Sequence, residues 1–270
     1  MAATVGLAVA IFLMGFGLAI VHGQHVNTFC ILQYCSSEMS ACALDRNCKL
    51  ALACVQDCAS NLTCSFGCLN SYDDAEFDAF MKCTATDHDC IQLSPDTPTQ
   101  CHPPATTLTN FTLEDIKGVW YTVKGYCPAS DCFNCQTSTY TIGPQPLQGQ
   151  VTWKYDVIAS DGTLRHLQTV ETFIQPDSQN GGILNITRTQ FGLDGQEQYR
   201  ILAFSGDDGY IFVYHCANMG GIVYEGAFVY SRTRTLTSSA LSQLMSRAEA
   251  YGYNITTFCS PNTSGCTSVE

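Results

Sequence analysis

Cysteine content is the feature that most constrains how this chain can fold. The sequence has 17 cysteines in 270 residues, and eleven of them lie between residues 24 and 102. Such density is typical of an oxidising compartment and a disulfide framework. The odd total leaves at least one thiol unpaired unless a second chain supplies its partner. A zinc site is the weaker alternative, because the short C-x2-C spacing of metal knuckles occurs only at Cys132 and Cys135.

The cysteines of residues 24–102 recur mostly every four to seven positions, which suits short helices and turns joined by bridges. The pairs Cys54/Cys58 and Cys64/Cys68 each place two thiols on one helical face, so we expect two cross-linked helices. Large apolar residues are few, so this helical module depends on its bridges, each contributing about 2–3 kcal/mol. A further helix is expected around residues 71–83, with acidic residues in its first turn.

A linker and then a run of strands follow. Residues 91–108 carry four prolines among Ser and Thr, which predicts a linker. Hairpin turns are expected at Asp161-Gly162, Asn180-Gly181-Gly182, Asp194-Gly195 and Asp208-Gly209. The strands between them are predicted over residues 118–124, 135–142, 150–157, 164–174, 182–190, 198–205, 209–216 and 223–231. Eight up-and-down strands are the number that closes a barrel around one small apolar ligand.

The last strand is followed by a helix signal. Thr237 is suited to cap a helix whose apolar stripe comprises Leu241, Leu244, Met245 and Ala248, and Gly252 can end it. We therefore predict an α+β protein. A small disulfide-rich helical domain (residues 24–102) precedes an eight-stranded antiparallel barrel domain with a C-terminal helix and tail (residues 109–270).

The N-terminus and the surface signals indicate the secretory route. Residues 4–21 form an apolar run without a charge, and we interpret residues 1–23 as a signal peptide, with an uncleaved anchor as the open alternative. Extracellular space or an organelle lumen is the expected location. A net charge of −12 without a basic cluster argues against a nucleic-acid partner. Glycosylation is predicted at the five Asn-x-Ser/Thr sequons, Asn61, Asn110, Asn185, Asn254 and Asn262.

Two sets of motifs resemble known families. Gly118-x-Trp120 at the start of the barrel and Arg232 after its last strand resemble the lipocalin pattern, in which the arginine packs over the tryptophan at the barrel base. The wider pattern, over residues 30–266, resembles the violaxanthin de-epoxidase family. It consists of the cysteine-rich module, NFTLEDIKGVWY (110–121), Cys135-Gln136, GYIFVY (209–214), GAFVYSRT (226–233) and the C-terminal cysteine. This resemblance implies a lipocalin-like barrel.

The resemblance also implies a set of disulfides, since sequence alone fixes no connectivity. The implied bridges are Cys30–Cys48, Cys35–Cys42, Cys54–Cys68, Cys58–Cys64, Cys83–Cys90 and Cys135–Cys266. Among the remaining cysteines, Cys127 with Cys132 and Cys216 with Cys259 are candidate pairs, and Cys101 is left over.

The family that the chain resembles reduces an epoxide on a xanthophyll ring, with ascorbate as reductant and no metal. Opening an epoxide requires an acid to protonate its oxygen, and a carboxyl in an apolar tunnel has a pKa suited to that task. The family's active carboxyl aligns with Glu197 and its pocket tyrosine with Tyr230, so these are our catalytic candidates. Residues expected to line the ligand site are Glu171, Phe173, Phe212 and His215.

Structural roles compete with each of these assignments. Glu197 lies near a Gly-rich turn and is by default an exposed carboxylate, Tyr230 alternates with Phe228 as a structural residue does, and His215 is as readily a satisfied edge residue. A structure with Glu197 and Tyr230 in one continuous apolar bore would favour catalysis.

Three functions remain open. We place a de-epoxidase first, because a carboxyl and a tyrosine are kept at both aligned positions. A non-catalytic secreted carrier of a carotenoid or other long apolar ligand is the alternative. A structural protein is the third, and a barrel filled by side chains would support it. The expected partners are a xanthophyll or other apolar small molecule and a membrane-lipid surface, with the thylakoid lumen as location if the protein reaches a plastid; the oligomeric state stays open.

Overall fold

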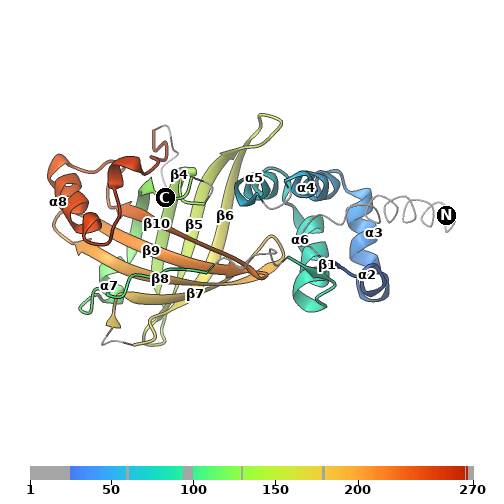
Figure 1. The fold of residues 1–270 in the computed structure, drawn as a ribbon, viewed down its shortest axis with the longest axis horizontal. Helices are drawn as coiled ribbons and strands as arrows, with labels where there is room; N and C mark the ends of the chain where they lie inside the picture. Colours follow the sequence, from blue (N-terminus) through green and yellow to red (C-terminus); the bar gives the residue numbers. More distant parts are fainter. Residues whose placement is uncertain are drawn as a thin grey trace.

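The computed structural model describes residues 25–58, 61–93, 100–128, 130–177, 180–264 and 266. Helices gather at one end of an eight-stranded barrel, and a further helix packs on the barrel wall (Figure 1). The predicted signal peptide and part of the predicted linker lie outside the described residues. Among the helices described, none combines the length and the hydropathy that crossing a membrane requires.

Short capped helices build the N-terminal module. They are α2 (Thr28–Tyr34), α3 (Ser36–Leu44), α4 (Arg46–Asp57), α5 (Leu62–Tyr72) and α6 (Ala75–Met81), and the π-helical turn η1 (Lys82–Asp87) continues α6. Asn27, Asp45, Asn61 and Asp74 each accept a hydrogen bond from the backbone N–H three residues on, which satisfies a donor that the helix start leaves free. β1 (His25–Val26) pairs with β2 (Ile91–Gln92) and brings the two ends of the module together.

Five disulfides hold the module, and they differ in part from the implied set. Cys54–Cys68 and Cys58–Cys64 cross-link α4 to α5 as expected. The implied bridges Cys30–Cys48, Cys35–Cys42 and Cys83–Cys90 are wrong. Because α2 packs against η1, Cys30 bonds to Cys90 and Cys35 bonds to Cys83, while Cys42 and Cys48 close the short turn between α3 and α4.

The barrel has the eight strands that the sequence predicts, closed in the order β10-β3-β4-β5-β6-β7-β8-β9 with antiparallel pairing. Its strands are β3 (Gly118–Gly125), β4 (Asn134–Ile142), β5 (Gln148–Ile158), β6 (Leu164–Ile174), β7 (Ile183–Gln190), β8 (Leu193–Ser205), β9 (Tyr210–Met219) and β10 (Ile222–Ser231). One predicted turn is wrong. Asp194 and Gly195 lie within β8, and the β7–β8 hairpin turns instead at Phe191 and Gly192, because Gln190 pairs with Leu193.

The barrel base is closed as the lipocalin pattern predicts. The short helix α7 (Leu113–Ile116) precedes β3, and the indole of Trp120 donates to its last carbonyl, Ile116 O, at 2.5 Å. The guanidinium of Arg232 lies 3.5 Å from the centre of the Trp120 ring. Gly118 has a φ of +91°, and a Cβ there would meet Arg232 Nη1 at 3.2 Å, so this glycine lets the arginine approach.

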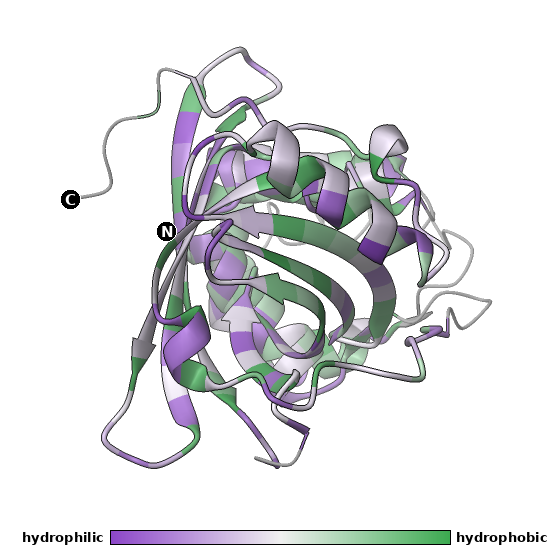
Figure 2. Cartoon of the chain, turned by 90° about the vertical axis from the view of Figure 1, so that its left-hand side faces the viewer, coloured by the Kyte–Doolittle hydropathy of each residue, from purple (hydrophilic) through white to green (hydrophobic). Residues whose placement is uncertain are grey.

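Side chains fill most of the barrel interior. Hydrophobic and hydrophilic bands alternate along the strands (Figure 2), as expected when every second residue faces inward. The inward side chains include Trp120, Tyr140, Phe173, Tyr199, Ile211 and Phe228, all at most 1 % exposed. The half of the barrel next to its base is therefore a packed core.

The C-terminal segment covers the barrel wall. α8 (Ser238–Glu249) begins at the predicted cap Thr237, and its buried residues Ala240, Leu244 and Ala248 face β8 and β9. Cys132–Cys259 and the implied bridge Cys135–Cys266 fasten the tail to the β3–β4 loop and to β4, and Cys101–Cys216 fastens the linker to β9. The pairings Cys127/Cys132 and Cys216/Cys259 are thus wrong, and Cys127 is the one free cysteine among the described residues.

Candidate active site

Four charged side chains are buried inside the barrel, toward the end that the helices cover. Glu171 of β6, Arg188 of β7, Glu197 of β8 and His215 of β9 are at most 8 % exposed. Strand register and alternation bring them together. Glu197 lies opposite Ile186, two residues from Arg188 on β7, and His215 lies opposite Tyr199, two residues from Glu197 on β8. Burial of charge is costly unless each group finds a partner, so the contacts define what the site can do.

His215 lies between two carboxylates. Its Nδ1 is 2.6 Å from Oε1 of Glu197, and its Nε2 is 3.0 Å from Oδ1 of Asp131, which belongs to the loop between β3 and β4. An imidazole that donates from both nitrogens is an imidazolium. Burial lowers the pKa of His215, but the two carboxylates outweigh burial and raise this pKa to about 10.

The loop holds Asp131 in place for this contact. The carboxylate of Asp131 also accepts from the backbone N–H of Cys127 at 2.9 Å and from the hydroxyl of Ser130 at 2.8 Å. Gly226 of β10 leaves the room for the pair, since a Cβ there would lie 2.3 Å from Nε2 of His215.

Arg188 bridges the two glutamates. Its Nη1 donates to Oε1 of Glu171 at 3.2 Å and lies 3.1 Å from Oε2 of Glu197, and its Nη2 donates to the hydroxyl of Tyr224. Burial raises the pKa of Glu171 to about 7 although Arg188 opposes the rise. Burial acts on Glu197 as well, but Arg188 and His215 together hold the pKa of Glu197 below its ordinary value. The two carboxyls therefore have different protonation states near neutral pH.

A small cavity of about 40 Å³ lies against these groups, and its lining includes Glu171, Arg188, Glu197, His215 and Trp153. It has room for a few water molecules. Four buried atoms of the lining make no hydrogen bond among the described residues: Oε2 of Glu171, Oε2 of Glu197, Nε of Arg188 and Nε1 of Trp153. The residues around the cavity thus hold two unused acceptors and two unused donors.

The helical module forms the outer wall of this cavity. Phe66 and Asn70 of α5 line it, and Asn70 accepts from the hydroxyl of Tyr155 at 3.1 Å. An open cleft of about 360 Å³ lies on the other side, between α5 and the ends of β4 and β5. Asn70 and Phe133 line both spaces and so separate the cleft from the cavity.

Tyr230 lies deeper in the barrel and is not among the residues that line the cavity. Its hydroxyl accepts from Ser138 at 3.0 Å and lies 3.2 Å from the hydroxyl of Tyr140. The ring of Phe228 stands between the two levels, 4.7 Å from Tyr230 and 5.3 Å from Tyr199 between ring centres. Glu197 and Tyr230 therefore do not share one continuous bore, the arrangement that would have favoured catalysis by this pair.

The other two predicted ligand-site residues lie on opposite faces of the barrel wall. Phe173 faces inward and packs against Tyr140 at 5.6 Å between ring centres. Phe212 faces outward, where it packs with Tyr253 and Phe258 beneath the C-terminal segment. The placement of Phe212 in the ligand site is wrong, because residues 211, 213 and 215 take the inward positions of β9.

Two members of the charged cluster were not predicted. Arg188 carries a usable signal, since it continues the inward positions of Leu184 and Ile186 on β7, where a charge needs a buried partner. Asp131 carries none, because a loop aspartate in a sequence is by default exposed.

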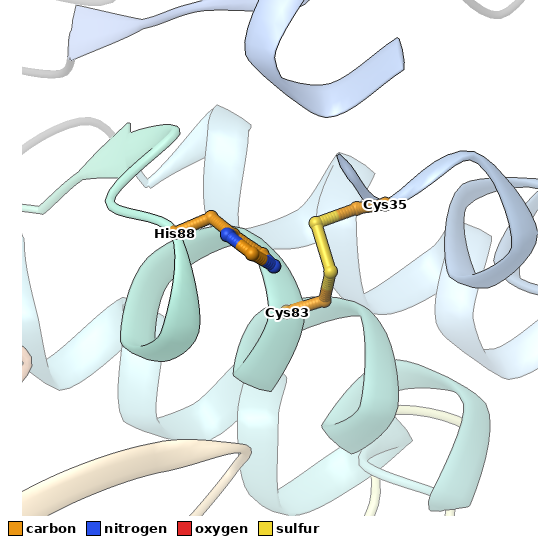
Figure 3. Close-up of side chains that lie close together, drawn as sticks. All are labelled: Cys35, Cys83 and His88. Carbon is orange, nitrogen blue, oxygen red and sulfur yellow. A yellow bond between two sulfur atoms is a disulfide. The ribbon is translucent and has the colours of Figure 1, made fainter. Parts of the chain in front are cut away.

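A possible metal site in the helical module is excluded by its chemistry. Cys35, Cys83 and His88 lie close together (Figure 3), but the two sulfurs form a disulfide and offer no thiolate to a metal. The ring of His88 instead stacks on Tyr34, with 4.7 Å between ring centres.

Comparisons with known proteins support one family. Residues 27–263 match the family model described as VDE lipocalin domain. The chain is 28 % identical over 238 residues to violaxanthin de-epoxidase, chloroplastic, of Arabidopsis thaliana, covering 85 % of this chain and 51 % of that protein. It is 26 % identical over 237 residues to the Spinacia oleracea protein of the same name, covering 85 % and 49 %. The chain thus spans about half the length of the curated relatives it matches.

Solved structures with a similar fold include apocrustacyanin A1 of lobster and insecticyanin of Manduca sexta. The first has a TM-score of 0.42 and 19 % identity, covering 56 % of this chain and 79 % of that chain. The second has a TM-score of 0.46 and 14 % identity, covering 63 % and 89 %.

Proposed function

The chain belongs to the violaxanthin de-epoxidase (VDE) lipocalin-domain family, and from that premise we propose that it reduces an epoxide on a xanthophyll ring. The observation that carries the proposal is the pair of buried carboxyls, Glu171 and Glu197, which face one cavity with different protonation states. Two carboxyls whose pKa values are pushed apart are the arrangement that acid-assisted chemistry uses.

The reaction sets what the protein must supply. Removal of an epoxide oxygen breaks both C–O bonds, forms a carbon–carbon double bond and releases water, which requires two electrons and two protons. Ascorbate would supply the electrons and become dehydroascorbate. The protein has to deliver a proton to the oxygen as the first C–O bond breaks, a contribution of about 10²–10⁴-fold in rate when it comes from a positioned acid.

The two catalytic candidates would have separate tasks. A Glu197 carboxylate at the cavity wall would stabilise the positive charge that develops on the ring carbon as the C–O bond breaks. Tyr230 would contact only a ligand that reaches below Phe228, where its hydroxyl can donate or accept.

Substrate access requires movement. A xanthophyll ring is far larger than a 40 Å³ space, so it reaches the carboxyls only when Asn70 and Phe133, which separate the cavity from the open cleft, move aside. A lipid surface is the expected source of the pigment. Apolar side chains exposed on β5 and β6 would suit contact with it, namely Ile158, Leu164, Val170 and Ile174.

The proposed location is an oxidising lumen, either in the secretory pathway or, after plastid delivery, in the thylakoid. Eight disulfides among the described residues support it. The asparagines of all five predicted glycosylation sites are exposed, which leaves them accessible to modification.

A turnover assay tests the proposal. Purified oxidised protein is incubated with violaxanthin in lipid micelles and ascorbate, from about pH 4.5 to 7.5, a range that spans the ordinary pKa values of carboxyl and histidine side chains. We expect ascorbate-dependent loss of violaxanthin that is abolished by joint Glu171→Gln and Glu197→Gln substitution, with exposed Glu114→Gln as control. An unchanged pigment at every pH would refute the proposal.

A structural protein is the second candidate, because side chains fill most of the barrel. Fluorescence separates it from a binding protein, since the only two tryptophans, Trp120 and Trp153, both lie in the barrel interior. A bound carotenoid would quench them. Absence of both quenching and turnover would favour the structural role, whereas quenching without turnover would favour a carrier.

A further inference from the structure

The buried cluster has more acids than counter-charges. Three carboxyl groups, Glu171, Glu197 and Asp131, share two cations, Arg188 and the imidazolium of His215. All five side chains are at most 8 % exposed. An unpaired buried carboxylate is expensive, so one of the three acids is expected to hold a proton instead.

The contacts show which acid that is. Asp131 accepts from His215, Cys127 N and Ser130, and Glu197 contacts both His215 and Arg188. Glu171 has one contact, Oε1 with an Arg188 nitrogen that Glu197 already shares. Oε2 makes no hydrogen bond among the described residues in either glutamate, but that of Glu197 lies 3.1 Å from Arg188, whereas that of Glu171 has no such ion pair. Glu171 is therefore the least compensated carboxyl of the cluster.

We propose that Glu171, rather than the aligned carboxyl Glu197, holds the dissociable proton of this site and delivers it to the substrate oxygen. The inference rests on the proposed function for the identity of the acceptor. It makes Glu197 a permanent carboxylate, held by His215 and Arg188. It also makes His215 and Asp131 positioning residues, because His215 contacts Glu197 and Asp131 contacts His215, whereas neither forms a hydrogen bond or ion pair with Glu171 in the described part of the chain.

The surroundings of Glu171 support both states of the group. The groups that face it are Arg188 on β7, Glu197 on β8 and His215 on β9, with the phenols of Tyr155, Tyr199 and Tyr224 nearby. Burial together with the charge of Glu197 raises its pKa to about 7, which favours the acid in a mildly acidic compartment. After proton transfer, Arg188 is already in contact and can stabilise the carboxylate that forms.

Infrared spectroscopy tests the protonation without any substrate. The C=O stretch of a protonated carboxyl is followed across pH in oxidised full-length protein carrying Asp73→Asn, because Asp73 is another carboxyl with a raised pKa, about 8. We expect a band that disappears near pH 7 and is absent in E171Q. In E197Q the band should persist but disappear at lower pH, since a like charge is gone while Arg188 remains. A band that survives in E171Q and is lost in E197Q would overturn the assignment.

Turnover then tests the delivery step. With violaxanthin and ascorbate, E171Q should lower the rate by about 10²–10⁴-fold while tryptophan quenching by the pigment stays unchanged. The wild-type rate should fall as pH rises through about 7, and this pH dependence should be absent in E171Q. Near wild-type turnover in E171Q would overturn the donor role. If the wild-type protein is inert, the proposed function fails, and the infrared titration still decides which carboxyl holds the proton.

Discussion

At the scale of single residues, the site is a set of buried charges that stabilise one another. His215 has almost no exposed surface and contacts carboxylates on two different segments, Glu197 on β8 and Asp131 in the β3–β4 loop. Its role is therefore different from that of an exposed histidine that pairs with one acid. Removal of one partner from such a buried cluster leaves uncompensated charge, which is where most of the cost arises.

We predict that His215→Gln lowers the free energy of unfolding by about 3–5 kcal/mol, because it leaves buried Asp131 without a cation and buried Glu197 with Arg188 alone. Urea unfolding of the oxidised protein at pH 6 measures the change. The matched control is His166→Gln, which breaks a 2.6 Å contact with Asp156 on the exposed wall, where the His166 side chain is 68 % exposed. The control should cost at most about 1 kcal/mol. Equal costs for the two variants would show that the buried cluster adds no special stability.

Sequence reasoning reached part of this site and not the rest. The inward direction of Glu171, Glu197 and His215 follows from strand alternation and from the family pattern. What no local pattern contains is the partner of each charge. Glu197 was expected to be the proton donor because it aligns with the family's acid, but its protonation depends on Arg188 and His215, which reach it from other strands.

At the scale of elements, the β7–β8 hairpin joins the barrel to the helices. Its two turn residues, Phe191 and Gly192, have positive φ values of 56° and 69°, as a tight turn that follows the strand twist requires. Phe191 is an unusual residue for that conformation, and its ring is buried in the core of the helical module. Gly192 lies against α6, where a Cβ would stand 2.2 Å from Asp78 O.

We predict that Gly192→Ala destabilises the contact between the barrel and the module by more than backbone strain alone. The control is Gly162→Ala in the β5–β6 turn, which has a φ of +85° but nothing within 4 Å of the added Cβ. In both variants the alanine must adopt a positive φ, which costs about 1 kcal/mol. Only Gly192→Ala should add about 1–3 kcal/mol for the clash, measured by urea unfolding. Indistinguishable losses would mean that α6 can shift away freely.

A second element-scale contact lies inside the barrel, where β10 passes the β3–β4 loop. We predict that Gly226→Ala displaces His215 or Asp131, because the new Cβ would lie 2.3 Å from His215 Nε2 and 2.7 Å from Asp131 Oδ2. Nitrogen-15 NMR of the imidazole should then show loss of the doubly hydrogen-bonded imidazolium near pH 8. Gly67→Ala in α5, with nothing within 4 Å, should leave that signal unchanged. Retention of the signal in Gly226→Ala would contradict the packing argument.

The sequence predicts the position of an element where local residues determine it. It does not do so where packing between distant segments decides. Thr237 starts α8, and the strands follow their alternation of apolar and polar residues. The Asp194-Gly195 turn was misplaced because its composition fits a turn as well as the actual one does, while register and the burial of Phe191 decide between them. Likewise, the partners of Cys30 and Cys35 depend on how α2 packs against η1, which spacing along the chain does not contain.

At the scale of the whole molecule, three groups in two places take up protons on folding. At the junction of the module and the barrel, burial and the neighbouring charge of Asp78 raise the pKa of Asp73 to about 8. Inside the barrel the pKa of Glu171 rises to about 7, and that of His215 to about 10. Each folded-state value exceeds the ordinary one, so the native state binds more protons than the unfolded chain over those intervals. The free energy of unfolding therefore falls as pH rises.

We predict that the urea midpoint of the oxidised protein is higher at pH 5 than at pH 8 and falls further toward pH 10. Asp73 contributes between about pH 4 and 8, Glu171 between about pH 4.5 and 7, and His215 between about pH 6.5 and 10. Each extra bound proton gives a slope of at most about 1.4 kcal/mol per pH unit. Asp73→Asn and Glu171→Gln should each flatten the acid part of the profile and leave the decline above pH 8, which His215 sets. A midpoint that rises from pH 5 to 8 would mean that Asp73 and Glu171 are ionised in the folded protein at pH 5, contrary to their raised pKa values.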